Sequence, residues 1–501
     1  MKDRYAISAA ALVCALTHLP TVAQTQAPRV TVNWDKTTAV SRSTPTLQVV
    51  VNPELLRGAK LHDGSFAALK MLGADYVRYV PWLPYPRQAV AELEPPTPAK
   101  TSWDFSHIDP TLDDFMKATE GHSVILNFST IPAWMFKTDK PVTYPADPNQ
   151  VYWDYTQGTQ LRDPSMKEPA EYYARLLSWY TKGGFTDENG KRWESGHHYT
   201  VPYWEVLNEI DLEHHWSPEA YTRFYDAVTA AMLKVDPNLK FVAISSAYPR
   251  THGAMYEYFF NPANHAPGTH LDFVSYHFYA SPPESEPFPA MQYTFFDQAD
   301  GFLATTRYIE QIKKRYLPNM QTDLDELGVI LPEDGKSNRI PGYKAKPEPE
   351  GYWDLAGAMY AYIYIEAAKM GIDVVGESQL VGYPTQFPSV SMMNYNTAAP
   401  NARFWVLKLL KDNFGPGDRV IETTFRNGDI AVQAFDTKTG KKLLMVNKRM
   451  TAQEVTLPDN AQGSTASFVA PSSRDSQPAT KQLQSGKVQL EPFEVAVIQV
   501  K

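Results

Sequence analysis

Two short stretches of the chain carry glutamates in settings that suit acid–base or nucleophilic chemistry. Residues 201–211 are an apolar run that ends abruptly in Asn208, Glu209 and Asp211. Residues 322–329, Thr-Asp-Leu-Asp-Glu-Leu-Gly-Val, contain Glu326. Both stretches have the composition of strands. Two carboxyl groups on either side of a cleft can protonate a glycosidic oxygen and attack the anomeric carbon or activate water. Glycosidic bond cleavage is the chemistry that the pair predicts, whereas an isolated Glu209 would be an ordinary solvated strand end.

Strand alternation predicts which way the second stretch points its side chains. Residues two apart share a face, so Leu324, Glu326 and Gly328 are grouped on one side. Asp325 and Leu327 are grouped on the other side. If Leu324 faces a barrel axis, Glu326 does so too, near the carboxyl end of its strand. Glu326 is therefore the predicted nucleophile.

The same rule groups Glu205, Leu207 and Glu209 on one face of the first stretch. Glu205 lies four residues deeper, where a lone charge carries a large desolvation cost. We expect it to pair with Arg78 and to be structural. Glu209 is the predicted acid/base, with its pKa raised by burial and by the charge of Glu326.

Other polar side chains stand at the predicted ends of neighbouring strands. An arginine or tyrosine beside a nucleophilic carboxylate would hold it ionised, and Asn208 could bond a sugar hydroxyl. The predicted substrate-binding residues of this kind are Arg78, Asn127, Asn208, His277, Tyr279 and Gln379. Each alone is as readily a structural polar group, so the prediction depends on their coincidence at strand ends.

Aromatic rings lie just beyond several predicted strand ends. They are Trp82, Tyr85, Trp134, Trp216 and Trp353. A flat ring there can stack on a sugar face or pack beneath a long loop. Trp134 and Trp353 are the two predicted to contact substrate.

The strand and helix pattern predicts an α/β fold, a (β/α)8 TIM barrel. Helical patterns such as 109–118, 169–180, 217–235, 298–315 and 352–370 separate the apolar strand runs. Those runs are residues 47–52, 76–81, 124–129, 203–209, 241–246, 273–279, 323–329 and 374–380. In such barrels, catalytic side chains come from the carboxyl ends of the strands.

After about residue 416 the pattern changes to short alternating runs with Asn-Gly and Thr-Gly turns, typical of antiparallel hairpins. We predict a barrel over residues 45–415 and an antiparallel β-sandwich over 416–501. Residues 24–44 are predicted to be an N-terminal strand and linker that joins the β-sandwich.

Residues 1–23 have the pattern of a secretory signal peptide, with Lys2 and Arg4 before an apolar run and small residues before a cut. The run is short for a membrane anchor. Cys14, the only cysteine, lies within it, and lipidation there is a weaker alternative. We therefore expect a secreted or periplasmic protein that has no membrane partner after cleavage.

Charge and metal-ligand spacing exclude several classes of partner. With 47 basic and 56 acidic residues the net charge is -9, and no basic tract is present, so nucleic acid is not an expected partner. His214-His215 lacks further ligands at matching spacing, so no metal and no cofactor are predicted. The expected partner is a carbohydrate.

The residues at three strand ends together resemble a known clan of enzymes. Trp204-Glu-Val-Leu-Asn-Glu209, His277-Phe-Tyr279 and Asp325-Glu326 are similar to the motifs of retaining (β/α)8 glycosidases. The member that the chain resembles most is glycoside hydrolase family 39, the β-xylosidase and α-L-iduronidase family. The resemblance implies acid/base catalysis by Glu209, nucleophilic attack by Glu326 and a C-terminal β-sandwich.

Three positions depart from the family pattern, which usually has tryptophan at Leu207, proline near Ile210 and threonine at Asp325. They leave the substrate open. Besides a β-xylosidase-like hydrolase, the sequence allows an endo-acting exopolysaccharide hydrolase. It also allows a carbohydrate-binding barrel without catalysis, although such a barrel would not need both glutamates.

Overall fold

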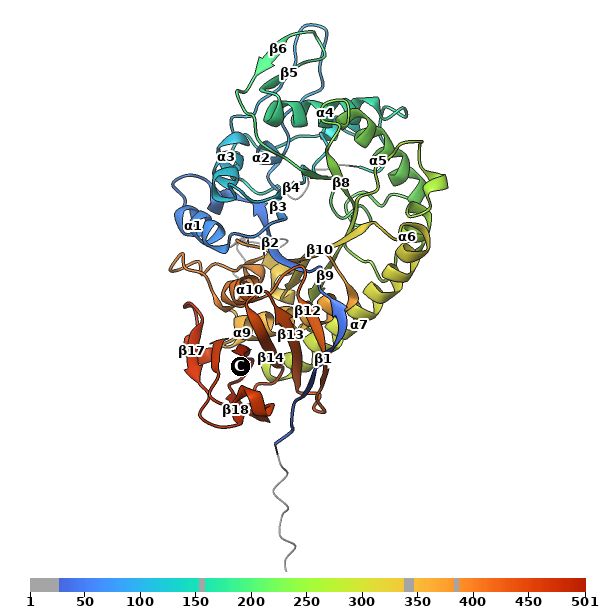
Figure 1. The fold of residues 1–501 in the computed structure, drawn as a ribbon. Helices are drawn as coiled ribbons and strands as arrows, with labels where there is room; N and C mark the ends of the chain where they lie inside the picture. Colours follow the sequence, from blue (N-terminus) through green and yellow to red (C-terminus); the bar gives the residue numbers. More distant parts are fainter. Residues whose placement is uncertain (1–26, 153–157, 338–346, 383–386) are drawn as a thin grey trace, which may run out of the picture.

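Eight buried parallel strands form a closed barrel at the centre of the molecule (Figure 1). The computed structural model describes residues 27–152, 158–337, 347–382 and 387–501. The strands follow one another around the barrel in chain order, and β11 closes it against β2. They are β2 (Thr44–Val51), β3 (Val77–Pro81), β4 (Val124–Leu126), β7 (Tyr203–Glu205), β8 (Lys240–Ser246), β9 (Phe273–Ala280), β10 (Gln321–Val329) and β11 (Val374–Glu377). The predicted (β/α)8 barrel is confirmed.

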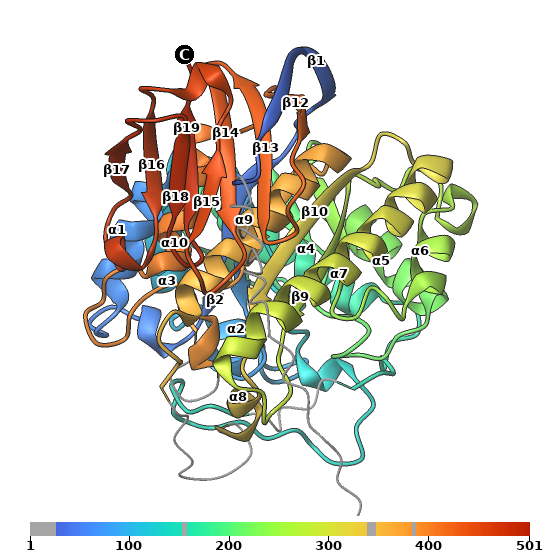
Figure 2. The ribbon, with the colours of Figure 1, turned by 90° about the horizontal axis from the view of Figure 1, so that it is seen from below.

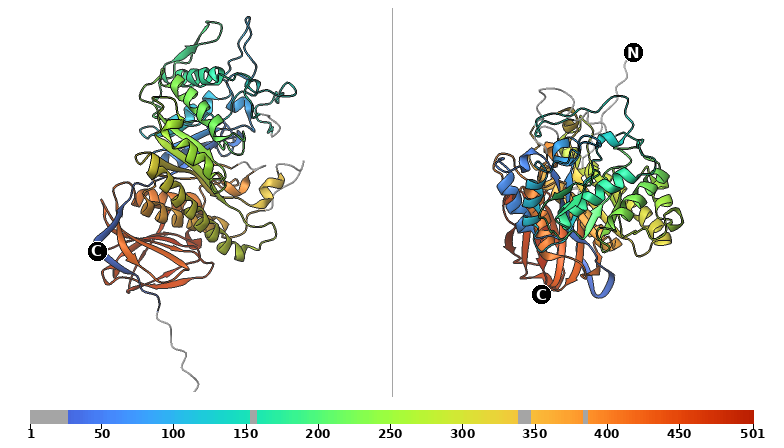
Figure 3. Two further views of the ribbon diagram at one scale, coloured as in Figure 1. Left: turned by 90° about the vertical axis from the view of Figure 1, so that its right-hand side faces the viewer. Right: turned by 90° about the horizontal axis from the view of Figure 1, so that it is seen from above.

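Helices follow the barrel strands and cover the outside of the barrel (Figures 1 and 3). The longer ones are α1 (His62–Leu72), α3 (Asp109–Ala118), α4 (Lys167–Thr181), α5 (Pro218–Met232), α6 (Gly253–Phe259), α7 (Phe288–Tyr316), α9 (Tyr352–Met370) and α10 (Ala402–Asn413). Short helices α2 (Pro86–Ala89) and α8 (Pro332–Ser337) and the hairpin β5 (Gly184–Thr186) with β6 (Arg192–Glu194) lie in the connections.

Local sequence explains where these elements begin and what they bury. All eight residues of β2 are buried, as expected for a parallel strand covered on both faces. Helix α5 begins where Ser217 caps it by accepting a hydrogen bond from the Ala220 backbone, with proline at the first helical position. Helix α9 is buried along most of its length because it lies between the barrel and the C-terminal sheet (Figure 2).

Several barrel strands end earlier than the sequence pattern predicts. Strand β7 ends at Glu205, β4 at Leu126 and β11 at Glu377. After β7 the backbone takes positive φ at Leu207 (69°) and Glu209 (42°). The expected alternation of Glu205, Leu207 and Glu209 on one face is therefore wrong. Leu207 is fully buried in the apolar core, and Glu209 is turned to the mouth by irregular backbone.

The C-terminal part of the chain, joined by the N-terminal strand β1, forms two antiparallel sheets. A seven-stranded sheet has the order β1-β12-β13-β14-β19-β16-β17, and a two-stranded sheet pairs β15 with β18. The strands are β1 (Thr31–Val40), β12 (Arg419–Thr424), β13 (Ile430–Thr437), β14 (Gly440–Asn447), β15 (Gln453–Thr456), β16 (Thr465–Val469), β17 (Ala479–Gln482), β18 (Lys487–Leu490) and β19 (Val495–Gln499). Apolar residues of both sheets share one core.

The early strand β1 pairs along β12 at the edge of the large sheet. The sequence pattern did not indicate strands β17 and β18, because each has only four residues and β17, Ala-Thr-Lys-Gln, has a single apolar one. Among the described residues, no helix is long and apolar enough to span a bilayer. The predicted signal peptide and its cysteine lie outside the described residues.

Candidate active site

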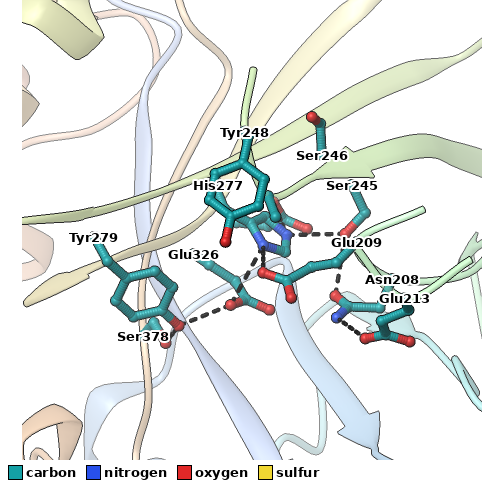
Figure 4. A network of polar contacts seen from close by, with 12 residues as sticks. Asn208, Glu209, Glu213, Ser245, Ser246, Tyr248, His277, Tyr279, Glu326 and Ser378 are labelled. Atoms are coloured by element: carbon teal, nitrogen blue, oxygen red, sulfur yellow. Dashed lines mark hydrogen bonds and ion pairs between the residues drawn. The ribbon is translucent and has the colours of Figure 1, made fainter. Parts of the chain in front are cut away.

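Glu209 and Glu326 meet at the carboxyl ends of the barrel strands, around His277 (Figure 4). Nδ1 of His277 lies 3.1 Å from Oε1 of Glu209 and 3.4 Å from Oε2 of Glu326. One oxygen of each carboxyl group and one His277 nitrogen all lie within 4.8 Å of one another. The side chains keep 14% and 9% of their surface exposed. Two carboxyl groups from well-separated strands thus face the same small space.

Glu326 accepts hydrogen bonds from two side chains. Nη1 of Arg78 donates to Oε1 at 2.6 Å, and the Tyr279 hydroxyl donates to Oε2 at 2.7 Å. Tyr279 is held in turn by the Ser378 hydroxyl. Burial alone would raise the pKa of Glu326, but the charges of His277 and Arg78 and the Tyr279 hydrogen bond hold it below the ordinary value. Glu326 is therefore ionised, with the two donors that the sequence predicted.

Glu209 has a different environment, although one of its carboxyl oxygens lies within 4.8 Å of an oxygen of Glu326. Among the described residues its side chain contacts His277 and has no arginine partner. Burial raises the pKa of Glu209, the charge of Glu326 raises it further, and His277 offsets only part of this increase. The pKa of Glu209 is thus raised while that of Glu326 is lowered, in the predicted directions, and the role of Glu209 as acid/base stays a prediction.

His277 connects the two carboxyl groups and carries charge itself. Burial opposes its charged form, but Glu326, Asp325 and Glu209 together raise the pKa of His277 to about 9. Its Nε2 lies 2.9 Å from the Ser245 hydroxyl. With both ring nitrogens protonated, His277 provides a positive charge between the carboxyl groups.

Below the mouth, Arg78 fills a buried polar layer. Its Nε donates to Glu205 at 2.5 Å, which confirms the predicted pair, and its Nη2 donates to Asn208 at 2.7 Å. Asn127 and Ser275 also donate to Glu205, at 2.7 and 2.5 Å. Despite complete burial, the charge of Arg78 and hydrogen bonds with Asp325, Ser275 and Arg78 lower the pKa of Glu205. Glu205 is a satisfied structural carboxylate.

Strand β10 departs from simple alternation, and this corrects the prediction for Asp325. Asp323 is opposite Ser275 on β9, whereas Glu326 is opposite His277, so β10 has one extra residue there. Such a bulge shifts the following side chains to the other face. Asp325, expected to point away from Glu326, instead faces the barrel interior, 3.1 Å from Nε of Arg78. Burial, and then the charge of Glu205, raise its pKa well above the ordinary value.

A cleft of about 1800 Å³ opens above the two carboxyl groups. Among the predicted site residues, those that line it are Asn208, Glu209, His277, Tyr279, Glu326 and Gln379. Asn127 lies beneath the site, fully buried against Glu205, so its predicted contact with substrate is wrong. Arg78 is also below the surface and acts through Glu326 and Asn208.

The predicted tryptophan platforms are displaced from the cleft. Trp134 donates to the Glu92 carbonyl at 2.8 Å and is covered by Arg162 at 4.4 Å. Trp353 packs edge-on against Tyr352. Neither tryptophan is among the described residues that line the cleft. Trp134 thus holds a loop and Trp353 packs at the start of α9, and the sequence pattern cannot separate such packing from sugar stacking.

Of the five aromatic residues singled out beyond predicted strand ends, Trp82 is the one that lines the cleft, and its indole donates to Glu213 at 2.7 Å. Glu213 also accepts from Asn208 at 2.8 Å. Sequence reasoning missed Glu213, Ser245 and Ser378 as site residues. Ser245 and Ser378 lie near the ends of two predicted strand runs, and Glu213 follows the end of a third by four residues, which is the signal that could have found them.

Glu209, His277 and Glu326 also form the one group of possible metal donors found among the described residues. The close approach of the two carboxyl groups does not require a cation, because His277 and Arg78 already oppose the carboxylate charge. His214 is buried, which lowers its pKa to about 4, and its ring stacks on Phe136 and Trp216. That the chain takes no metal stays a prediction.

Several solved structures with a similar fold are glycoside hydrolases, at low sequence identity to this chain. A GH51 arabinofuranosidase from Xanthomonas axonopodis pv. citri has a TM-score of 0.64 and 14% identity, over 95% of this chain and 100% of that one. A GH30 endoxylanase from Clostridium papyrosolvens C71 has a TM-score of 0.57 and 14% identity, over 94% and 99%. A glucosidase from Croceicoccus marinus has a TM-score of 0.59 and 13% identity, over 94% and 98%.

No family model matches the sequence, and no curated protein matches it. At this identity the likenesses show the fold, a TIM barrel carrying a C-terminal β domain. Membership of glycoside hydrolase family 39 stays a prediction.

Proposed function

We propose that the chain is a retaining glycoside hydrolase, in which Glu209 is the acid/base and Glu326 the nucleophile. One observation carries the proposal: two carboxyl oxygens within 4.8 Å of one another, in unequal environments. Retaining enzymes hold their carboxyl groups about 5–5.5 Å apart, whereas inverting enzymes leave about 6.5–9.5 Å for a water molecule. The spacing here supports double displacement.

In the first step, a Glu326 oxygen attacks the anomeric carbon while Glu209 gives its proton to the glycosidic oxygen. The bond from the anomeric carbon to that oxygen breaks, and an ester to Glu326 forms. In the second step, the Glu209 carboxylate takes a proton from water, whose oxygen displaces Glu326 from the anomeric carbon. Glu209 returns to its acid form, so the cycle closes without a cofactor.

The positive groups around Glu326 suit both steps. Arg78 and Tyr279 keep it ionised before attack and accommodate its departure as a carboxylate afterwards. When Glu326 becomes an ester its charge disappears, so the pKa of Glu209 falls. The same group then serves as a base. This change of role follows from the electrostatic coupling between the two carboxyl groups.

We propose a β-linked oligo- or polysaccharide as substrate, with xylose-containing chains tested first. Support comes from the motifs that resemble family 39 and from the similar folds, which include an endoxylanase and arabinofuranosidases. The signal-like N-terminus supports export to the periplasm or the medium, where such polymers occur.

A panel of aryl glycosides tests the proposal: xyloside, glucoside, galactoside, arabinoside and iduronide. We expect the wild type to release chromophore from at least one, and Glu326→Gln to lose at least about 10⁴-fold of that rate. A wild type that binds oligosaccharides but cleaves no member of the panel would instead support the non-catalytic carbohydrate-binding barrel.

A further inference from the structure

Besides the reacting carboxyl groups, the cleft is lined by residues of helix α7 and of the loop after β8, and we call this part of the cleft the arm. Tyr248 and Arg250, in the loop after β8, line one side of this arm. Asp297, Gly301 and Thr305 of α7 line the other. The arm is continuous with the site, because Glu209 and Glu326 line the same cleft.

Helix α7 is fixed firmly as a wall of the arm. The Gln298 side chain accepts from the Ser281 backbone at 2.9 Å and donates to the Ser281 carbonyl at 2.8 Å. One turn further, Phe302 stacks on Phe278 of β9 with ring centroids 4.7 Å apart. The wall therefore keeps its position relative to the strand that carries His277 and Tyr279.

The surface of α7 along the arm is one helical stripe. Asp297, Gly301 and Thr305 follow one another at intervals of four residues, so they lie on one face. At about 1.5 Å per residue the stripe is about 12 Å long, which is room for more than one sugar ring.

Gly301 has no packing reason to be glycine. It lies inside a 29-residue helix, where glycine costs roughly 0.5–1 kcal/mol relative to alanine. A Cβ added there would meet no atom within 4 Å. A side chain at this position would instead project over the floor of the arm, so glycine keeps the arm open.

The opposite wall presents Tyr248, whose ring is 54% exposed beside the site (Figure 4). Asp211 holds its loop by accepting backbone hydrogen bonds from Ala247 and Tyr248, both at 2.9 Å. Asp211 also accepts from the Ser246 hydroxyl at 2.7 Å. Because Asp211 follows Glu209 by two residues, the segment that carries the acid/base also positions this ring.

The link from Glu209 through Asp211 to the Tyr248 loop indicates which part of a substrate the arm faces. The acid must stand beside the leaving oxygen, and the sugar that forms the ester must lie over Glu326. The Glu209 backbone is bonded to the Ser245 carbonyl at 2.8 Å, just before the Tyr248 loop. Burial, and then the nearby charge of Glu209, raise the pKa of Tyr248. The arm thus begins on the acid's side of the cleft.

We infer that this arm binds the leaving-group part of a neutral oligosaccharide, with more than one sugar unit beyond the bond that is cleaved. The inference rests on the proposed glycosidase function and deepens it. Tyr248 gives a ring face for stacking. The charges of the arm, Asp297 and Asp300 against Arg250, do not favour an acidic polymer. An enzyme that removes small alcohols from a single sugar has no use for such a surface.

Filling the arm tests the inference with little risk to folding, since replacing Gly301 favours the helix. We expect Gly301→Trp to lower kcat/KM for xylohexaose at least about tenfold more than kcat/KM for 4-nitrophenyl β-xyloside. The quantity compared is the ratio of kcat/KM for xylohexaose to kcat/KM for 4-nitrophenyl β-xyloside. Gln311→Trp, at an exposed position of α7 outside the cleft lining, is the matched control and should leave this ratio as in the wild type. Tyr248→Ala should lower the ratio as well, whereas Tyr248→Phe should keep most of it.

A transfer assay tests whether the arm binds the leaving-group side of the cleaved glycosidic bond. When xylobiose is added as acceptor, its hydroxyl oxygen takes the anomeric carbon from Glu326, and its proton passes to Glu209. We expect Gly301→Trp to lower the yield of transfer product relative to hydrolysis of the same aryl xyloside. An unchanged oligosaccharide ratio or an unchanged transfer yield overturns the inference and leaves the glycosidase function standing. If the wild type cleaves neither substrate, and no other matched pair of glycosides, the glycosidase function itself falls.

Discussion

The barrel holds two layers of carboxyl groups that differ in their partners, although only a few residues separate them. In the deep layer Glu205 accepts from Arg78, Asn127 and Ser275 and is completely buried. At the mouth Glu209 contacts His277 and keeps part of its surface in the cleft. Glu209 is the more exposed of the two, yet its pKa is raised whereas the pKa of Glu205 is lowered, so burial alone does not set the charge state of a carboxyl group here. The difference lies in how many donors stabilise its charge.

Glu326 lies between these two extremes. It shares Arg78 with the deep layer and His277 with the mouth, and Tyr279 donates to it from the side. These contacts make it an ionised group that still faces the cleft. The number of donors is therefore consistent with a structural role for Glu205 and supports the proposed roles of Glu326 as nucleophile and Glu209 as acid/base.

The largest effect is expected at the mouth. Glu209→Gln removes the proton donor, so substrates with sugar leaving groups should lose about 10²–10⁴-fold in kcat/KM. Activated aryl glycosides should lose much less, because their leaving groups depart without protonation. Added azide should restore turnover of the aryl substrate and give the glycosyl azide with retained configuration. Equal losses on both substrate types would contradict the assignment.

Tyr279→Phe is expected to have the next largest effect. It removes a hydrogen bond to a charged group, worth about 1.5–3 kcal/mol. A hydrogen bond to the ionised form lowers a pKa, so its loss should raise the pKa of Glu326. The acid limb of the kcat/KM profile should therefore move to higher pH, while the basic limb, governed by Glu209, stays in place. A shift in both limbs, or in the basic limb only, would be inconsistent with this donor arrangement.

Glu205→Gln should separate the two layers by affecting stability more than turnover. Loss of the charge paired with Arg78 should lower the free energy of unfolding by about 1.5–3 kcal/mol, measured by denaturant titration. Glu209→Gln is the matched control and should stay near the wild-type stability. If Glu205→Gln folds normally and loses turnover as completely as Glu209→Gln, the structural role of Glu205 is wrong.

The smallest effect on turnover is expected for Asp325→Asn, because Asp325 is held in its neutral form and the amide has nearly the same shape. Its raised pKa means that the folded state keeps a proton that the unfolded state releases, so wild-type stability falls as the pH rises above the ordinary aspartate range. Relative to the wild type, the variant should gain stability with pH, by at most about 1.4 kcal/mol per pH unit. A constant difference between pH 5 and 8 would show that Asp325 is ionised in the fold.

Much of this arrangement could be predicted from the sequence because it depends on strand order and strand ends. The eight apolar runs, the pair of Glu205 with Arg78, and the donors to Glu326 all follow from parallel strands sharing one carboxyl end. Asp325 could not be placed, because the bulge in β10 leaves no mark in the residue pattern.

Loop residues escaped prediction for a different reason. Trp134 and Trp353 stand after strand ends just as Trp82 does, and only the path of the loops decides which ring reaches the cleft. Tyr248 was not singled out at all, since its exposure depends on Asp211, a contact made across two loops. Periodicity predicts the faces of regular elements but carries no information on such contacts.

The stereochemistry of the first product tests the central claim most directly. An aryl glycoside that the enzyme cleaves should be followed by proton NMR during the first minutes, before mutarotation mixes the anomers. Double displacement through Glu326 predicts that the first sugar released has the same anomeric configuration as the substrate. A first product of the opposite configuration would contradict the account, because it would mean that water attacks the anomeric carbon directly.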